Sequence, residues 1–290
     1  MTSKIILGLA AAALLTPAIA VAQTAPAADT SAEALAQELG GDSITVGLGA
    51  GYLPDYEGSD DYRWAPVPGV IGSVSGINFQ VLGNRANADL IPTRQGQDWD
   101  FQAGPIGVVN FMRSSRSSID DPRVRALGEL DTAIELGGFV GIGKTGVVTS
   151  PYDKLSVSVS YRHDVAGVHR SGIWQPTINY FTPLSTKAAV GLFGSAERVE
   201  DKYVRTYFDI TPAQAAASGL PAFRGRGGWK SWTVGAIGTY SLTGNLLKGF
   251  KIIGGGTYRK LINDVAASPT VSIAGSRNQW LGVIGLGYTF

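Results

Sequence analysis

Cysteine is absent from this 290-residue chain, and charged residues are scarce. Without a thiol the protein can form no disulfide, bind no metal through thiolates and carry no lipid on a cysteine. Charged residues make up 16% of the chain, against about 25% in typical soluble domains. The formal net charge is +1, whereas nucleic-acid-binding domains are usually strongly basic. The composition therefore argues against a nucleic-acid partner and is unusual for a soluble protein.

Long apolar runs are also missing, except at the start of the sequence. There Lys4 precedes an apolar stretch from Ile5 to Leu15, and the small-residue pattern Ala20-Val21-Ala22 follows. This order is typical of a secretory signal peptide. The apolar stretch is shorter than the roughly 20 residues that a membrane-spanning helix needs. We therefore predict a signal peptide over residues 1–22 and no helical membrane span in the remainder.

Glycine is abundant, at 39 of 290 residues, and apolar residues alternate with small or polar ones. In the stretch 279–290, Trp280, Leu286, Tyr288 and Phe290 fall on one face, and the other face is mostly small or polar. Successive side chains of a strand point to opposite faces, so this stretch predicts a ribbon with one apolar side. In a transmembrane β-barrel the apolar side faces lipid and the other side faces the lumen.

The same two-residue period recurs along the chain and predicts about twelve strands, an even number as in single-chain bacterial barrels. They fall near residues 44–52, 64–72, 77–81, 85–91, 99–109, 132–141, 155–161, 173–181, 187–196, 232–242, 250–260 and 279–290. We therefore predict an all-β fold, a transmembrane antiparallel β-barrel over residues 44–290 with short helix only in loops. A periplasmic tail over residues 23–43 is predicted to precede it.

The predicted connections alternate between long and short, as in barrels with longer external loops and shorter periplasmic turns. The long ones lie within residues 53–63, 112–130, 164–171, 197–228 and 262–278. In the longest, Thr211 precedes Pro212, Gln214 has capping-box spacing and Gly219 follows an alanine run. These residues predict a short helix with a defined start and end.

The final strand suggests how the protein is inserted into its membrane. An ending of Tyr288-Thr289-Phe290 resembles the signal that the barrel-assembly machinery of bacterial outer membranes reads. We assign Trp280, Leu286, Tyr288 and Phe290 to this assembly signal. The predicted location is the cell outer membrane, with lipid and lipopolysaccharide around the barrel.

Several stretches resemble the MipA/OmpV family of outer-membrane proteins, over nearly all of the chain after the predicted signal peptide. Beside the ending 287–290, residues 203–208 and 211–221, Ser268-Pro269, and Pro66 with Pro68 match the family. The most characteristic match is a loop made of Tyr56, Glu57, Gly58, Ser59, Asp60, Asp61, Tyr62 and Arg63, preceded by Pro54 and Asp55. The resemblance implies a barrel that acts as a scaffold for murein-synthesising or murein-degrading enzymes, as a porin-like protein or as a surface adhesin. It implies no catalytic site.

Acidic residues in this loop raise the question of a metal site. Asp55, Glu57, Asp60 and Asp61 supply the oxygen ligands that Ca²⁺ prefers, but their spacing lacks the full pattern of an EF-hand loop. A solvated loop that touches lipopolysaccharide through divalent ions, or a loop that bends into the lumen, is favoured. We assign no metal ligand and no cofactor.

Catalytic groups are few. Only His163 and His169 offer an imidazole. His169-Arg170-Ser171 has the His-x-Ser spacing of outer-membrane phospholipase A, but a triad also needs an orienting third group and an oxyanion site, and no matching second motif is evident. We predict that the protein is not an enzyme and assign no catalytic residue.

Two functional classes remain open. One is an interaction protein whose periplasmic side binds murein enzymes, and the other is a channel for small solutes. A mixed-charge loop bears on the second class, because folded inward it would select solutes by charge, although a solvated loop is the favoured interpretation. That loop contains Arg113, Arg116, Asp120, Asp121, Arg123 and Arg125.

Overall fold

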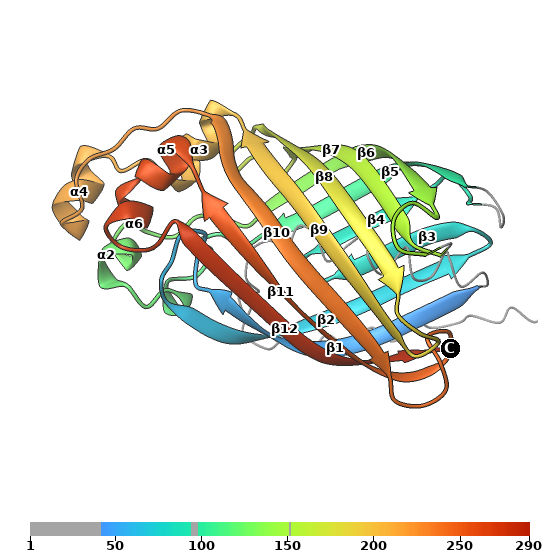
Figure 1. Cartoon of the computed structure of the whole chain (residues 1–290). Helices are drawn as coiled ribbons and strands as arrows, with labels where there is room; N and C mark the ends of the chain where they lie inside the picture. The colour runs from blue at the N-terminus through green and yellow to red at the C-terminus, as the bar shows by residue number, and fades with distance from the viewer. Residues whose placement is uncertain (1–41, 94–97, 151) are drawn as a thin grey trace, which may run out of the picture.

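The computed structural model describes residues 42–93, 98–150 and 152–290, and these residues form a closed barrel of antiparallel strands (Figure 1). The strands are β1 (Ser43–Pro54), β2 (Tyr62–Val74), β3 (Ile77–Leu82), β4 (Arg85–Asp89), β5 (Trp99–Asn110), β6 (Ala133–Thr145), β7 (Lys154–Asp164), β8 (Gly172–Pro183), β9 (Ala188–Val199), β10 (Gly228–Ser241), β11 (Gly249–Leu261) and β12 (Asn278–Thr289). The predicted all-β barrel is confirmed, and each predicted strand overlaps one of these. The predicted signal peptide and the predicted tail up to residue 41 lie outside the described residues, and Ser43 already belongs to β1.

The barrel closes where β1 pairs with β12. Their register places Gly49 opposite Gly285 and Val46 opposite Tyr288. The two backbones approach so closely at the glycine pair that a Cβ added to Gly285 would lie 2.8 Å from the Cα of Gly49. Small residues on the lumen side of these strands therefore permit the contact that completes the wall.

Large apolar side chains cover the outer face, and aromatic rings form a belt near each end of it. Tyr258 packs on Trp280 in one belt, with 4.8 Å between ring centroids. Tyr288 packs on Phe250 and Phe290 in the other, also at 4.8 Å. Trp280 and Tyr288 are roughly 26 Å apart along β12, or about 20 Å along the barrel axis once the usual strand tilt is included, which is near the height of the apolar band of outer-membrane barrels. The outer face therefore has the form that a lipid bilayer requires.

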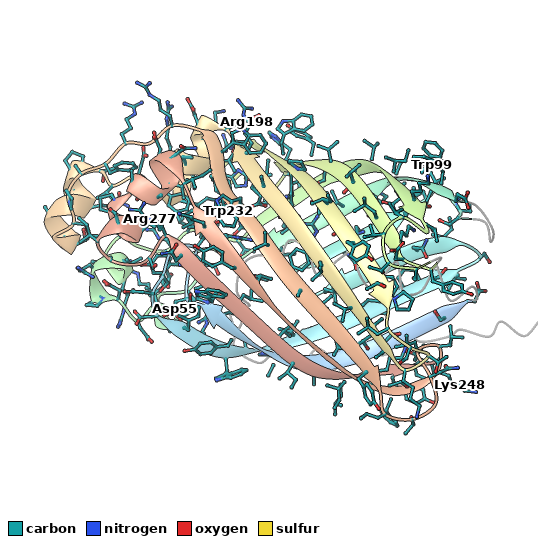
Figure 2. The ribbon with its side chains drawn as sticks, in the orientation of Figure 1. Asp55, Trp99, Arg198, Trp232, Lys248 and Arg277 are labelled. Carbon is teal, nitrogen blue, oxygen red and sulfur yellow. The ribbon has the colours of Figure 1, made fainter. Side chains whose placement is uncertain are left out.

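The two ends of the barrel differ in the length of their connections. At the loop end, residues 111–132, 200–227 and 262–277 form the three longest connections, with shorter ones at 55–61, 83–84 and 165–171; at the turn end the longest connections are 90–98 and 146–153. Figure 2 marks the loop end by Arg198 and Arg277 and the turn end by Trp99 and Lys248. In outer-membrane barrels the longer loops face outward and the turns face the periplasm.

All helices among the described residues lie in the long connections, which together form a structure that we call the cap (Figure 1). The predicted helix is α4, capped by Thr211 and Gln214 in a capping box and ended by Gly219 with a φ of 73°. No helix among the described residues is long and apolar enough to cross a membrane. The helices are η1 (Arg116–Ser118), α2 (Pro122–Arg125), α3 (Asp201–Tyr207), α4 (Pro212–Ser218), α5 (Asn263–Ala267) and α6 (Pro269–Ser272).

The cap has a hydrophobic core of its own, shared with the upper ends of several strands. Its residues come from connections that are far apart in the sequence, so the core ties the long loops to one another. One cluster contains Met112, Ile173, Val199, Tyr203, Val204, Tyr207, Phe208, Leu261, Val265 and Val271. A second contains Tyr56, Ile119, Val124, Leu127, Ile210, Leu220 and Ala274.

Candidate functional site at the loop end of the lumen

The loop that carries the family resemblance folds back into the mouth of the barrel. The hydroxyl of Tyr56 donates a hydrogen bond to the backbone oxygen of Ala274 at 2.6 Å. Gly58 has a φ of +104°, and a Cβ there would lie 2.5 Å from Val271, so glycine is required for this turn. The side chain of Gln279 accepts from the N–H of Gly58 at 3.2 Å. The loop is thereby fixed against the β11–β12 connection.

Six buried charged side chains surround the point where this loop enters the lumen. We call them the charge cluster: Glu57, Glu135, Arg162, Glu197, Lys230 and Arg259. Their three carboxylates and three cations balance in formal charge. A buried ion is costly unless it is paired and hydrogen-bonded, so the close pairing described next is what makes the cluster compatible with burial.

Arg162 is at the centre of one half of the charge cluster. Its guanidinium lies 2.6 Å from Glu135 and 2.6 Å from Glu197, and it also donates to the side-chain oxygen of Gln175 at 2.9 Å. Arg85 donates to the same oxygen at 3.1 Å. Arg162 is 1% exposed, so these bonds replace its contact with water.

Lys230 joins that half to the loop. Its ammonium lies 2.9 Å from Glu57 and 3.0 Å from Glu197, while Arg259 lies 3.1 Å from Glu57. The register of β9 and β10 shifts between Trp229 and Ser231. A bulge of this kind adds one residue to a strand and changes the direction of its side chain. In β10 that residue is Lys230, whose side chain is buried in the charge cluster.

Tyr203 of α3 covers the charge cluster from the cap. Its hydroxyl donates to Glu57 at 3.2 Å and accepts from Lys230 at 3.0 Å. Burial, together with the nearby carboxylates, raises the pKa of this hydroxyl well above its usual value. Tyr203 therefore remains a neutral donor, and the cap is attached to the charged layer by hydrogen bonds as well as by packing.

His169 and Ser171, paired in the sequence analysis, do lie together. The Nδ1 atom of His169 is 2.8 Å from the Oγ atom of Ser171, and its Nε2 atom is 3.4 Å from Glu135. All three side chains are buried, and Glu135 also binds Arg162. The arrangement resembles a triad in composition, but its burial in the cap is that of a structural hydrogen-bond network. His163 lies on β7, apart from it.

The acidic residues of the loop do not converge. Asp60 is exposed, whereas Glu57 is 4% exposed and bound to two cations. Asp55 is 8% exposed and accepts from the N–H of Asp120 at 3.0 Å. Within the described part of the chain, no group of three or more His, Asp or Glu side chains is placed to hold a metal ion. The solvated loop favoured from the sequence is thus wrong for Asp55 and Glu57, and the alternative of bending into the lumen holds for Glu57.

The basic loop is only partly at the surface. Arg113 is 3% exposed, and it donates to the backbone oxygens of Tyr207 at 3.2 Å and Gly128 at 3.1 Å. Burial lowers its pKa to about 10, so it stays charged at neutral pH. Arg123 instead pairs with Asp121 at 2.6 Å near the surface. Arg113 is therefore part of the cap core, and the expectation of a fully solvated loop is wrong for this residue.

Further predicted residues lie at the loop end, at the turn end and on the outer face of the barrel. Tyr62 accepts a hydrogen bond from the N–H of Trp280 at 3.0 Å, which brings the family loop and the predicted assembly signal together at the loop end. Arg63 donates to the backbone oxygen of Ser118 at 3.1 Å. Tyr288 belongs to the aromatic belt at the turn end. Leu286 and Phe290, 56% and 69% exposed, lie on the outer face.

Most of the charge cluster was missed by sequence reasoning. The sequence motifs point to Glu57 alone among its members. The other five lie within strands and belong to no motif. One signal was available: Arg162, Glu197 and Arg259 fall on the lumen face of their strands, close to the loop end. A charge on that face must find a partner in the lumen, but the sequence does not say which.

The comparisons with known proteins concern the whole barrel. The model of the family described as MltA-interacting protein MipA matches residues 46–290. A comparison with curated proteins finds no match.

Three solved structures illustrate the likeness to other barrels. An outer membrane channel of Pseudomonas putida, COG4313, is 12% identical, with 86% of this chain and 96% of that chain covered and a TM-score of 0.44. The Pseudomonas putida toluene transporter TodX is 9% identical, with 92% and 93% covered and a TM-score of 0.37. The channel DcaP of Acinetobacter baumannii is 9% identical, with 86% and 96% covered and a TM-score of 0.38. These are distant likenesses of barrel architecture.

Proposed function

The chain belongs to the family of the MltA-interacting protein MipA, and we propose that it is a scaffold for murein-degrading or murein-synthesising enzymes. The protein is an outer-membrane β-barrel. The family description supports the proposal because it names an interaction with MltA. The enzymes would bind from the periplasm, where the short turns lie.

The cap is the observation that favours a scaffold over an open channel. It fills the loop end with two hydrophobic clusters above a layer of paired charges. A solute that crossed this end would have to displace buried side chains that are packed and hydrogen-bonded. A barrel built in this way is better suited to binding at a surface than to rapid passage.

The turn end offers apolar side chains for such binding. Val148, Leu184 and Leu247 lie on three different turns and are 67%, 65% and 39% exposed. Exposed apolar groups that gather at one end of a protein commonly mark an interaction surface. This end faces the compartment in which murein enzymes act.

Site-specific photo-crosslinking in cells tests the scaffold. A photoreactive residue at Val148 or Leu184 should give crosslinks to a murein hydrolase or synthase. The control is the same residue at Ile273, which is 50% exposed in the cap and should give none. Failure of both turn positions to capture such an enzyme would contradict the proposal.

Passage of small solutes is the second candidate. Small residues on the lumen face, such as Gly47, Gly49, Ser156 and Ser158, leave room inside the wall and favour it. Single-channel conductance of the purified protein in planar bilayers separates the two functions. Ion conduction without capture of a murein enzyme would reverse their order.

We also propose that the barrel-assembly machinery recognises the final strand through Trp280, Leu286, Tyr288 and Phe290. Their side chains lie on the outer face, where a membrane-embedded partner can reach them before the barrel closes.

A further inference from the structure

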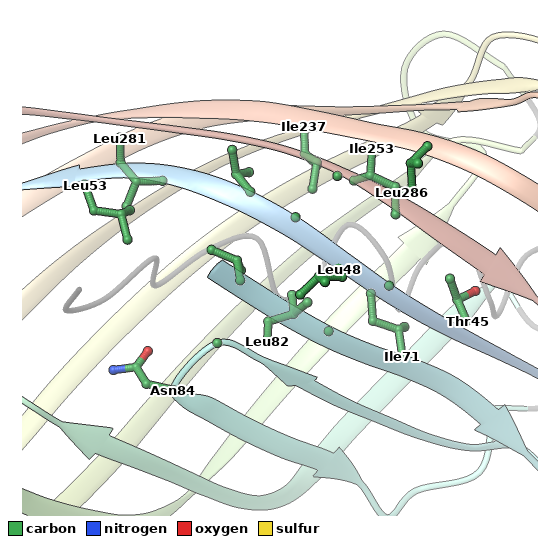
Figure 3. A pocket seen from close by; sticks show the side chains of 17 residues that line it. Thr45, Leu48, Leu53, Ile71, Leu82, Asn84, Ile237, Ile253, Leu281 and Leu286 are labelled. Atoms are coloured by element: carbon green, nitrogen blue, oxygen red, sulfur yellow. The ribbon is translucent and has the colours of Figure 1, made fainter. Parts of the chain in front are cut away.

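Below the charge cluster, the lumen holds a cavity of about 120 Å³ (Figure 3). Its wall combines residues of β1, β2, β3, β10, β11 and β12. Side chains of Leu53, Val67, Leu82, Ile253 and Val283 contribute to it. The cavity therefore lies against the strands that close the barrel; most of its lining side chains point into the lumen, while Leu48 and Leu286, which also line it, belong to the outer face.

The polar side chains of this cavity already make hydrogen bonds. Among the described residues that line it, Thr45 and Asn84 alone carry polar side chains. The hydroxyl of Thr45 lies 2.7 Å from that of Thr289, and the amide of Asn84 donates to the backbone oxygen of Val109 at 2.8 Å. A sugar or an ion would lose its own hydrogen bonds on entry without finding partners here. The chemistry of the wall selects an uncharged, apolar molecule.

The cavity reaches a place where the wall of strands is interrupted. β3 and β4 have six and five residues, whereas β2 and β5 beside them have 13 and 12. β2 pairs with β3 from Gly69 to Val74, so its part nearer the loop end lacks the partner that β3 supplies below. Gly83, at the tip of the short hairpin, lines the cavity. The cavity thus extends to the end of this hairpin, beside the interruption of the wall.

Prolines occupy the unpaired edge of β2. The backbone oxygen of Pro68 accepts from the N–H of Gly83 at 2.9 Å, so the backbone of Pro68 faces the hairpin. Alternate residues of a strand direct their backbone groups to the same side, which puts the backbone of Pro66 on the same edge. A proline has no N–H to offer to another strand. The sequence therefore disfavours extension of the sheet across the interruption.

We infer that the cavity is a binding site for one small uncharged apolar molecule, about the size of a single aromatic ring, taken up from the membrane. An apolar cavity of roughly 150 Å³ in another protein binds benzene, and this cavity is of similar size. The site is separate from the proposed contact with murein enzymes, so either can fail without the other.

Methyl NMR of the full chain in lipid nanodiscs tests the site with benzene as the probe. Ile237 and Ile253 line the cavity, while Ile252 and Ile284 are on the lipid face, 40% and 58% exposed. Isoleucine labelling therefore reports both environments at once. We expect saturable shifts of the Ile237 and Ile253 methyl signals. Shifts of Ile252 and Ile284 should be small or grow in proportion to benzene, as expected of probe dissolved in lipid.

A matched pair of substitutions tests whether benzene binds in the cavity or on the lipid face. Val283→Trp fills the cavity from β12, whereas Ile284→Trp puts the same ring on the lipid face of the next residue. We expect Val283→Trp to weaken the saturable binding by at least about tenfold, because the indole takes the space of the probe, and Ile284→Trp to leave it unchanged. Val67→Phe, from β2, should act like Val283→Trp and serves if that variant fails to fold.

Two results would overturn the inference. One is the absence of saturable shifts at Ile237 and Ile253 in the wild type. The other is unchanged binding in a folded Val283→Trp or Val67→Phe protein, where folding is judged by the change of electrophoretic mobility on heating.

Discussion

Two connections, one at each end of the barrel, are held by contacts of different range. At the loop end, Glu57 pairs with Lys230 and Arg259, which are distant in the sequence. At the turn end, Asp153 accepts from the backbone N–H of Val147 at 2.6 Å within the same connection. A turn of this kind can form as soon as its own residues are made, whereas the loop end requires the strands that carry its charges to be in place.

The two ends should also differ in the free energy that is lost when one contact is removed. Buried charges at the loop end depend on one another, since loss of one partner leaves another charge without compensation in a medium of low dielectric constant. At the turn end the buried pair of Lys154 and Asp100, at 2.8 Å, lies outside the charge cluster. Asp153 is held largely by backbone N–H groups of its own turn, and its loss leaves no opposite charge unpaired among the described residues there. Changes at the loop end should therefore cost more and act over a longer range.

The largest effect is expected from Glu197→Ala in the charge cluster. It leaves Arg162 and Lys230 with one carboxylate fewer, and removal of one partner of a buried pair costs about 3 to 5 kcal/mol. Urea unfolding of the detergent-folded barrel, followed by mobility on electrophoresis, measures the loss. Arg123→Ala is the control, because its pair with Asp121 is near the surface, with Arg123 43% exposed, and should contribute less than about 1 kcal/mol. Equal urea midpoints for Glu197→Ala and wild type would contradict the comparison.

Truncation of two isoleucines compares how tightly side chains pack in the cap and beside the cavity. Ile173 is 1% exposed and belongs to the cap core, so Ile173→Ala should cost about 2 to 5 kcal/mol. Ile253 already borders empty space, so Ile253→Ala should cost below about 2 kcal/mol, since fewer contacts are lost. The same urea measurement applies to both. A larger loss for Ile253→Ala would mean that the lumen beside it is packed.

Phe290→Ala tests the turn end and the proposed assembly signal. Phe290 is 69% exposed on the outer face and contacts Tyr288, so its loss should cost only about 1 to 3 kcal/mol of stability. We nevertheless expect much less protein in the outer membrane, because recognition during insertion is lost. Refolding in detergent is compared with the cellular amount of heat-modifiable protein. A normal amount in cells would show that Phe290 has no role in assembly.

The smallest effect is expected from Asp153→Asn. Burial alone would raise the pKa of this carboxyl, but hydrogen bonds from the N–H groups of Thr149 and Val147 and from the hydroxyl of Tyr180 outweigh burial and lower it. A lowered pKa adds stability that is present above the unfolded-state value of about 3.9 and is lost as the pH falls through the folded-state value.

At neutral pH the substitution should therefore cost about 1 kcal/mol. The difference from wild type in the urea midpoint should shrink as the pH is lowered below about 4. A difference that stays constant down to the most acidic conditions would exclude ionised Asp153 as its source.

Local patterns in the sequence predicted what depends on neighbouring residues. Alternation along β12 identified its lipid face because side chains of a strand change sides at every residue. Helix α4 was predicted with its cap and its end, since Thr211, Gln214 and Gly219 act within one short segment. The positions of the longest connections, within 111–132, 200–227 and 262–277, followed from the predicted strands.

Only the tertiary structure decided which distant residues meet. Nothing near Glu57 in the sequence indicates that its carboxylate pairs with Lys230 and Arg259, or that Arg113 is buried under the cap. Pairing of this kind depends on the closure of β1 on β12 and on the height at which each strand ends. The sequence by itself determined the wall of the barrel, because a wall is a repeat of local alternation. The closed barrel decided the content of the lumen, because charges and cavities there are made by side chains that meet only across its interior.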